Sequence, residues 1–352
     1  MSRHEAGRQA GSLLLRTIRS GTSGARVFLL RQPGGSTVAT KVTRNPRVSS
    51  SVQAQRHALM TKHFASHTPA VLGTAAEAGL DVIVTAAPAV WSLDEAIDRL
   101  GPTPELYAAW RDVVAALVTV WRSTARPGFD PAHATRNHDL RCRRGLQGLE
   151  DALTTDLQPP SGWLSLVING SDMGSWARAF ERLLGVGRPD FRVTCHGDPH
   201  AGNVLVAHDG TWHLVDWEWS GEHHDWRMMV SHLIGSWYVR DLLDHASGTV
   251  TAGPDGLVLD YVIGKSPRLR RFGDPAAEAY RRMTTPTHTE QDLSDVARYV
   301  ALLLLREIPR AVLAGRRHLI APLLGECVRL TTGEHRRHPT IRLLTAPVRA
   351  AA

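Results

Sequence analysis

The chain has 352 residues, a net charge of +7 and an apolar content of 43%, which is ordinary for a folded globular protein. No signal peptide is visible, and the longest apolar run, Tyr299 to Leu305, is far below the roughly 20 residues of a membrane-spanning helix. The three cysteines are scattered and odd in number, which argues against a disulfide framework or a CxxC metal site. We therefore expect a soluble, cytoplasmic protein with no membrane partner.

The positive charge is concentrated at the start of the chain. Residues 1–76 contain nine Arg, two Lys and a single acid, Glu5, so this stretch has a net charge of +10 and the remainder has −3. A basic segment can bind nucleic acid, a membrane surface or a polyphosphate. The charges are spaced singly and no aromatic residues interleave with them. We expect most of them to form a solvated face and predict no nucleic-acid partner.

The first 90 residues are rich in predicted strands. Residues 25–30 and 37–42 have strand-like patterns on either side of a Pro-Gly-Gly turn. Ser49 to Ser51 offer N-caps for a helix that runs to about Phe64. Residues 82–84 predict a short buried strand that ends at Ala87-Pro88, and we place a lobe boundary there.

After this boundary the pattern becomes helical. Thr103 caps and Pro104 opens a helix whose apolar residues recur on one face: Leu106, Trp110, Val113, Val114, Leu117 and Trp121. Further helices are predicted from Ser175, over residues 293–313 with a bend at Pro309, and over residues 318–330. The stretch 245–290 is rich in Gly and Pro, and we predict a long loop or lid there.

The most informative segment is a predicted hairpin. Residues 203–207 and 211–215 have strand patterns, and Asp209-Gly210 is a strong turn signal. A two-residue turn would pair position 206 with 213 and would place Asn203 opposite Asp216. Opposed side chains have Cβ atoms about 4.5–5.5 Å apart. An amide oxygen and a carboxylate at this spacing suit Mg²⁺ that is bound together with phosphates.

Upstream of the hairpin, Asp198 lies in a loop marked by Gly197, Pro199 and Gly202. A carboxylate held there can accept a proton from an attacking hydroxyl, or orient that hydroxyl. One acid together with two oxygen ligands for a metal is what phosphoryl transfer requires of a protein. The alternative is that these polar residues only form turns, and for any one of them alone it would be the simpler interpretation.

The spacing of these residues resembles a known family. The run HGDPHAGN at 196–203, followed by DWE at 216–218, has the spacing of the eukaryotic-type kinase catalytic loop and metal-binding segment. In detail it resembles the aminoglycoside phosphotransferase and choline kinase family, which are small-molecule kinases with a protein-kinase-like fold. The resemblance implies that Asp198 is the catalytic base, that Asn203 and Asp216 bind Mg²⁺, and that His196 braces the loop.

A weaker resemblance covers most of residues 15–240. Lys41, one of only three lysines beside 38 arginines, matches the strand lysine that contacts the α- and β-phosphates in the family. The alternative is a solvent-facing strand lysine. Gly21 and Gly24 match a phosphate-covering loop of the family. Asp225 resembles a structural aspartate of the family, and we interpret it as a helix N-cap rather than a catalyst.

The chain departs from the family at the partner of this lysine. The family lysine pairs with a Glu on the following helix, but no Asp or Glu occurs between Glu5 and Glu77. By alignment, Gln55 takes that place. An amide can orient an ammonium group but cannot neutralise it, so either Lys41 is held by phosphate and Asp216 alone, or activity is reduced.

We therefore predict an α+β, two-lobed protein-kinase-like fold, with an N-lobe over residues 1–88 and a mainly helical C-lobe over 89–352. The predicted activity is transfer of the γ-phosphate of ATP or GTP to a hydroxyl of a small molecule, with Mg²⁺ as cofactor and the base of the donor against Val84 and Ala86. An antibiotic is the first candidate acceptor, and choline, a sugar or a nucleoside is the alternative. A pseudokinase that binds nucleotide without turnover is the rival hypothesis. The sequence leaves the oligomeric state open.

Overall fold

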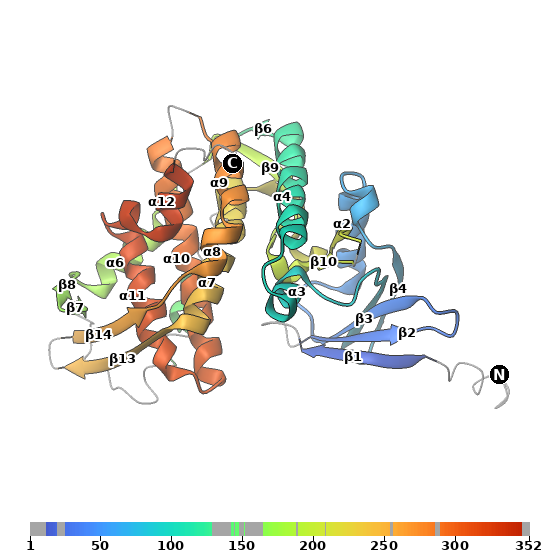
Figure 1. The fold of residues 1–352 in the computed structure, drawn as a ribbon, viewed down its shortest axis with the longest axis horizontal. Helices are drawn as coiled ribbons and strands as arrows, with labels where there is room; N and C mark the ends of the chain where they lie inside the picture. Colours follow the sequence, from blue (N-terminus) through green and yellow to red (C-terminus); the bar gives the residue numbers. More distant parts are fainter. Residues whose placement is uncertain are drawn as a thin grey trace. The chain divides into compact units, whose positions relative to one another are not determined.

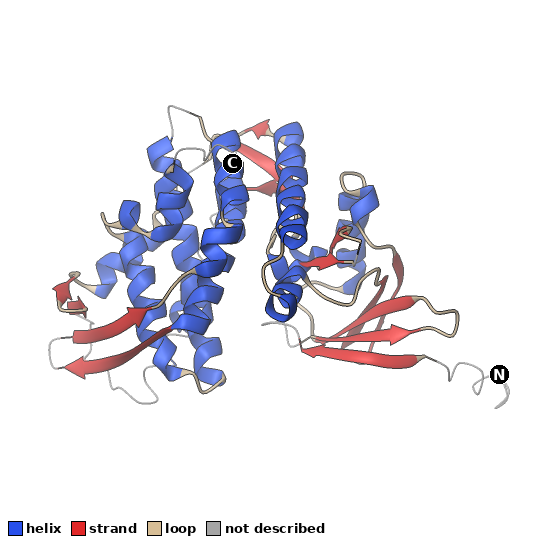
Figure 2. Ribbon diagram, in the orientation of Figure 1, coloured by secondary structure: helices blue, strands red, loops and turns tan. Residues whose placement is uncertain are grey.

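The structure is a computed structural model, and its secondary structure is drawn in Figures 1 and 2. It describes residues 12–19, 25–128, 142–143, 145–147, 151, 165–187, 189–207, 209–253, 256–285 and 289–346. These residues form two compact units. Unit 1 is built from Met1–Ala116 and Cys195–Gly221, and unit 2 from Leu117–Thr194 and Glu222–Ala352, each within the described ranges.

Unit 1 contains a five-stranded antiparallel sheet with the strand order β1-β2-β3-β5-β4. The strands are β1 (Leu13–Arg19), β2 (Arg26–Arg31), β3 (Thr37–Arg44), β4 (Val71–Glu77) and β5 (Leu80–Ala86). The sequence predicted β2, β3 and β5 but not β1 or β4. Strand β3 lies between β2 and β5, and its Lys41 is paired with Val27 on one side and Ile83 on the other. A central strand is a rigid place from which to present a side chain.

Helices α2 (Ser50–Thr61) and α4 (Pro104–Thr124) begin at caps that the sequence identified, whereas α3 (Leu93–Leu100) was not predicted. Helix α2 is capped by the Ser49 side chain, which accepts a hydrogen bond from the Val52 N–H. Helix α3 begins with a capping box between Ser92 and Glu95. Helix α4 has Pro104 at its first position, and all six apolar residues predicted for its inner face are buried. Short 3₁₀ segments are η1 (Ala65–His67), η2 (Ala201–Asn203) and η3 (Trp217–Trp219).

The hairpin of unit 1 has a different register from the predicted one. Strands β10 (Val204–Val206) and β11 (Trp212–Leu214) pair Val206 with Trp212, so the prediction of position 206 opposite 213 was wrong. Ala207 pairs with Thr211 instead, which leaves three residues in the turn, with Gly210 at φ +82°. A three-residue hairpin with glycine in the left-handed region is a common type, and Asp209 supports this one by accepting hydrogen bonds from Thr211. As a result, Asn203 is opposite Val215 and not Asp216.

Unit 2 is mainly helical (Figure 2). Beyond the end of α4, its long helices are α7 (Trp226–His245), α10 (Thr289–Leu313) and α11 (Ile320–Thr331). Pro309 lies inside α10. Its shorter helices are α6 (Trp176–Leu184), α8 (Pro267–Phe272), α9 (Asp274–Met283) and α12 (Pro339–Thr345), with 3₁₀ segments η4 (Arg317–Leu319) and η5 (His335–Arg337). One small sheet has the order β12-β9-β6, formed by β6 (Arg126–Pro127), β9 (Phe191–Cys195) and β12 (Gly221–His224); another has the order β13-β14-β7-β8, with β7 (Ser165–Ile168) and β8 (Ser171–Asp172).

The segment 245–290 was predicted as a loop or lid, and this prediction was wrong. It forms a hairpin, β13 (Ala246–Gly253) with β14 (Gly256–Ile263), followed by α8 and α9. Most of the described Gly and Pro residues lie at or near the ends of these elements, although Gly248 lies inside β13: Gly253 pairs with Gly256 at the hairpin end, and Pro267 and Pro275 lie in the first turns of α8 and α9. The run from Leu257 to Ile263 is rich in apolar and β-branched residues, apart from the exposed Asp260, and this composition is typical of a strand.

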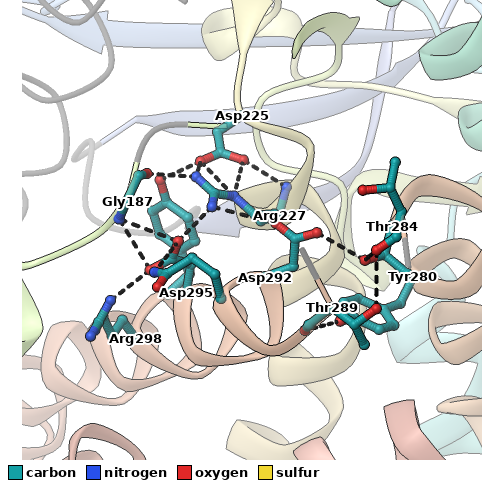
Figure 3. A network of polar contacts seen from close by, with 12 residues as sticks. Gly187, Asp225, Arg227, Tyr280, Thr284, Thr289, Asp292, Asp295 and Arg298 are labelled. Carbon is teal, nitrogen blue, oxygen red and sulfur yellow. Dashed lines mark hydrogen bonds and ion pairs between the residues drawn. The ribbon is translucent and has the colours of Figure 1, made fainter. Parts of the chain in front are cut away.

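A buried ionic network connects four segments of unit 2 (Figure 3). Arg227 of α7, with a side chain only 1% exposed, lies between Asp225 and Asp295 and also donates to the Gly187 carbonyl. Asp225 caps α7 by accepting a hydrogen bond from the Arg227 N–H, as the sequence predicted, and it also accepts one from the Tyr299 hydroxyl. A guanidinium group can be buried here because three carboxylates surround it, the third being Asp292.

The fold class predicted from the sequence is confirmed: the chain is α+β, with an antiparallel sheet in its N-terminal part and helices in its C-terminal part. The lobe boundary at residue 88 remains a prediction. Within the ranges that the structure describes, no helix is long and apolar enough to cross a lipid bilayer.

Candidate active site

Three charged side chains meet in unit 1. The Lys41 Nζ atom is 2.7 Å from Oδ1 of Asp216 and 3.0 Å from Oε2 of Glu218, although 175 or more residues separate them in sequence. Burial alone would lower the pKa of Lys41, but the two carboxylates outweigh it and raise this pKa above its ordinary value. The lysine is therefore charged and fixed in position, and it is not the solvent-facing strand lysine that was the alternative.

The two carboxylates differ in their exposure to solvent. The Glu218 side chain is 9% exposed, and that of Asp216 is 38% exposed. Asp216 has φ +63° and ψ +59°, in the left-handed region that Asp and Asn enter more readily than most residues. It directly precedes the turn η3, so the chain reverses at this residue and presents its carboxylate beside Lys41.

The buried side chain of Trp217 stabilises this turn. It is 4% exposed, and its ring packs against His57, Phe64 and His196, with ring centroids 6.3, 5.9 and 4.6 Å away. Next to it, Arg56 of α2 donates a hydrogen bond to the backbone carbonyl of Glu218. Helix α2 and the loop at residue 196 thus hold the segment 216–218 from two sides.

The loop at 196–198 is attached to the hairpin by His196. This residue is fully buried, and its Nε2 lies 2.7 Å from the Val215 carbonyl, while its Nδ1 accepts the Asp198 N–H at 3.4 Å. Burial lowers the pKa of His196, so the ring is neutral and carries its proton on Nε2, where the carbonyl accepts it. This is the geometry that the bracing role predicted for His196 requires.

Asp198 and Asn203 lie close together on the same loop. The Asn203 Nδ2 donates to the Asp198 carbonyl at 3.0 Å, which fixes the amide and leaves its oxygen facing away from that bond. His200 is fixed by the Gly202 N–H, and its Nε2 lies 3.7 Å from Oδ2 of Asp198. The structure therefore brings together Lys41, His196, Asp198, Asn203 and Asp216 within unit 1.

The donors present suit a magnesium ion bound with phosphates. The carboxylate of Asp216 is partly exposed, and the Asn203 side-chain oxygen accepts no hydrogen bond from any described residue. Magnesium in such sites takes one or two protein oxygens and completes its octahedron with water and phosphate oxygens. Over the described ranges, no group of three or more His, Cys, Asp or Glu residues is arranged to hold a metal by itself. A site that needs the nucleotide to complete it is consistent with both observations.

Other predicted site residues are not brought to this cluster. Val84 and Ala86 of β5 pair with Thr40 and Val38, so their side chains are on the face opposite Lys41. Gln55 is exposed on α2, and its side chain makes no hydrogen bond or ion pair with a described residue. Gly21 and Gly24 lie outside the described residues. Asp225 belongs to unit 2 and to the network around Arg227.

Sequence reasoning missed the contacts that Glu218, Arg56 and His200 make in this cluster. The signal for Glu218 was available, because the acid-free stretch from residue 6 to 76 means that a counter-charge for Lys41 must come from elsewhere in the chain. Glu218 stands two residues after Asp216, within the same motif. Arg56 stands next to Gln55, and only the orientation of α2 shows which of the two side chains reaches the site.

The family comparison agrees with this geometry. The family model described as "Phosphotransferase enzyme family" (APH) matches residues 15–223, more than half of the chain. The chain therefore belongs to the phosphotransferase enzyme family, as its resemblance to aminoglycoside phosphotransferases and choline kinases implied, and it is a small-molecule phosphotransferase by family. A search of curated proteins gave no significant match.

Several solved structures are similar to the chain at low sequence identity. An aminoglycoside-3'-phosphotransferase of type VIII is 18% identical, with 87% of this chain and 97% of that chain covered and a TM-score of 0.44. An ethanolamine kinase from Plasmodium vivax is 8% identical, with 98% and 86% covered and a TM-score of 0.49. An amicoumacin kinase, solved with AMP-PNP, Ca²⁺ and amicoumacin, is 14% identical, with 98% of both chains covered and a TM-score of 0.46.

Proposed function

We propose that this protein transfers the γ-phosphate of ATP or GTP to a hydroxyl group of a small molecule, with Mg²⁺ as cofactor. The observation that carries the proposal is the contact of the β3 lysine, Lys41, with Asp216 after the hairpin, 2.7 Å between Nζ and Oδ1. Phosphoryl transfer works mainly by positioning and charge neutralisation, and a fixed cation beside the carboxylate that we propose as a metal ligand suits both requirements.

Each of the clustered residues has a distinct role in the proposed reaction. Asp198 accepts the proton of the acceptor hydroxyl or orients it for attack. Lys41 binds donor phosphate oxygens as a point charge, and Asn203 and Asp216 hold the metal through their side-chain oxygens. When bound, Mg²⁺ supplies further neutralisation of the phosphate charge. His196 keeps the two loops in register without touching the substrates.

The base of the nucleotide would be bound by the chain that follows β5. The N–H groups of Ala86 and Ala87 already donate to Ala70 and Thr37, so they are not available to a base. The residues after them, Ala89 and Val90, are the first whose N–H groups make no hydrogen bond to another described residue. We therefore move the proposed base contact from the side chains of Val84 and Ala86 to the backbone of residues 89–90.

The acceptor that we propose first is a hydroxylated antibiotic of low positive charge. The 276 residues from Glu77 onward have a net charge of only −3, which gives little attraction for a polycation such as an aminoglycoside. The second class is a metabolic alcohol such as choline, a sugar or a nucleoside. Screening phosphate transfer from ATP and GTP over a panel of neutral antibiotics, aminoglycosides and metabolic alcohols ranks these classes.

The test of the proposed activity uses Lys41→Met beside the wild type. We expect wild-type transfer to at least one acceptor and a loss of roughly 10²-fold or more in kcat/KM for the variant, since a fixed phosphate-binding cation is removed. Arg44→Met, at the exposed end of the same strand, is the control and should retain activity. Nucleotide binding without transfer to any acceptor would instead identify a pseudokinase, and equal activity of Lys41→Met and wild type would contradict the assigned role of Lys41.

A further inference from the structure

The two carboxylates that contact Lys41 are suited to different partners. Glu218 is slightly more buried than the lysine, with a side-chain exposure of 9% against 13% for Lys41, whereas Asp216 is 38% exposed. A buried carboxylate is stable only if its cation stays beside it, because an isolated buried charge is costly. An exposed carboxylate has room for water, a metal or phosphate, and loses little when its partner changes.

The N-terminal part of unit 1 cannot provide another counter-charge. No Asp or Glu occurs between residues 6 and 76, which include β3 and all of α2. Gln55, which the alignment places in the position of the expected glutamate, is exposed. Helix α2 instead contributes a cation, Arg56, and this cation does not approach Lys41 but binds the backbone carbonyl of Glu218.

From these contacts we infer that Glu218 is the resident counter-ion and positioning residue of Lys41, that Arg56 holds it in place, and that Asp216 is thereby left to the metal and the phosphates. The inference rests on the proposed function. It explains how the chain can lack an acid on α2. The acid that contacts Lys41 comes from the segment after the hairpin, and α2 instead supplies the hydrogen-bond donor Arg56, which binds that segment.

The geometry gives a reason for two carboxylates rather than one. An ammonium group has three N–H donors. Two of them point at Asp216 and Glu218, and one remains for a phosphate oxygen. Once Asp216 binds a metal ion instead, Glu218 is the only described residue that still holds the ammonium group of Lys41 in position. Without it, Lys41 would lose a charged partner in a site where its head group is only partly hydrated.

The test measures ADP affinity by calorimetry, with and without Mg²⁺, for wild type and Glu218→Gln. We expect ADP affinity to fall about tenfold under both conditions, so that the factor by which Mg²⁺ strengthens ADP binding is unchanged. The control is Glu222→Gln, which removes an exposed carboxylate four residues away and should leave both affinities unchanged. A fall in the Mg²⁺ factor itself would overturn the inference, because it would make Glu218 a metal ligand rather than the partner of Lys41.

A second measurement needs no nucleotide. If Lys41 and Glu218 form a unit, their effects on the thermal unfolding midpoint are not additive, and Glu218→Gln should cost less in a Lys41→Met background than in the wild type. Additive shifts would contradict the pairing. Arg56→Gln should lower ADP affinity in the same direction as Glu218→Gln but by less. Full rescue of Glu218→Gln by Gln55→Glu would also overturn the inference, because it would show that α2 is the natural place of the counter-charge.

Failure of this inference can be distinguished from failure of the proposed function. If the wild type binds ADP and transfers phosphate while Glu218→Gln behaves like the wild type, only the inference fails. If the wild type neither binds ADP nor transfers phosphate, the proposed function fails, and the unfolding cycle still decides whether Lys41 and Glu218 are coupled.

Discussion

Gly197 lies directly against the backbone carbonyl of Trp219: a Cβ atom on Gly197 would be 2.1 Å from that oxygen. The glycine also has φ +84°, so its position is closed to other residues by its conformation and by this contact. The contact joins the residue before Asp198 to the turn that follows Asp216, and it fixes the spacing between the proposed base and the proposed metal ligand.

This contact predicts a large effect of Gly197→Ala. Gly210→Ala is a matched control, because Gly210 has nearly the same φ, +82°, but a Cβ added there would have no atom within 4 Å. Gly210→Ala should cost about 1 kcal/mol of unfolding free energy through backbone strain alone. Gly197→Ala should cost several kcal/mol or abolish activity, since the backbone at Trp219 must move. Chemical denaturation and kinetics on both variants measure the difference, and equal losses would show that the contact is unimportant.

Removing the charge of Asp198 should affect turnover and not nucleotide binding. For Asp198→Asn we expect kcat to fall by roughly 10²–10⁴ with ADP affinity nearly unchanged, because the amide cannot accept the proton of the acceptor hydroxyl. Asp112→Asn, which changes an exposed aspartate of α4, is the control for loss of one negative charge. Steady-state kinetics and calorimetry give the two quantities, and wild-type turnover in Asp198→Asn would rule out the assigned role.

Removing the charge of Asp216 should affect the metal dependence of binding. Asp216→Asn keeps the size of the side chain and suits the left-handed backbone, so the turn should survive. We expect the strengthening of ADP binding by Mg²⁺ to fall by about tenfold or more. Asp209→Asn, in the exposed turn of the same hairpin, should leave it unchanged. Calorimetry over a range of Mg²⁺ concentrations tests this, and an undiminished Mg²⁺ effect would remove Asp216 from the set of ligands.

The network around Arg227 predicts that substitutions of Asp292 and Asp295 differ in their effects on stability (Figure 3). Burial, helped by the charges of Asp225 and Asp295, raises the pKa of Asp292. The folded protein then keeps this proton at pH values where the unfolded chain, with a pKa of about 3.9, has lost it, so this group makes stability fall as pH rises through that window. Asp292→Asn should remove this decrease and cost little at pH 7.

Asp295→Asn is the contrasting variant. Asp295 is fully buried and accepts hydrogen bonds from Arg227, Arg298 and the Gly187 N–H. Its replacement leaves Arg227 undercompensated, at a cost of about 3–5 kcal/mol. Denaturation curves of both variants between pH 4 and 7 check the pair, and similar losses at pH 7 would mean that Asp292 is ionised and as important to Arg227 as Asp295.

The elements that sequence predicted well are those with local signals. The caps Ser49, Thr103 and Asp225 begin helices where expected, because an N-cap is recognised from its own side chain and the next few residues. The loop at 196–203 and the segment at Asp216 were selected from their spacing alone, and the catalytic and metal-binding roles of their residues remain predictions. The buried face of α4 was predicted from the helical spacing of its apolar residues.

The errors concern features that depend on contacts distant in sequence. The predicted register of the hairpin was wrong by one position because Asp209-Gly210 fits a two-residue turn and a three-residue turn equally well. The Gly- and Pro-rich segment 245–290 was taken for a loop, although these residues lie where elements meet and β14 is paired with β7, about ninety residues earlier. Glu218 was seen as part of a motif but not as a partner of Lys41, because only the folded chain brings them together.

The backbone at Asp216 has a consequence for which acids the position accepts. A residue with φ +63° favours Asp and Asn, whose short polar side chains are enriched there, and disfavours Glu, although Glu carries the same charge. The exchange Asp216→Glu is therefore not conservative, whereas Glu218, two residues later, does not have a positive φ. The backbone conformation of the turn, and not contact with a substrate, is therefore what favours Asp over Glu at position 216.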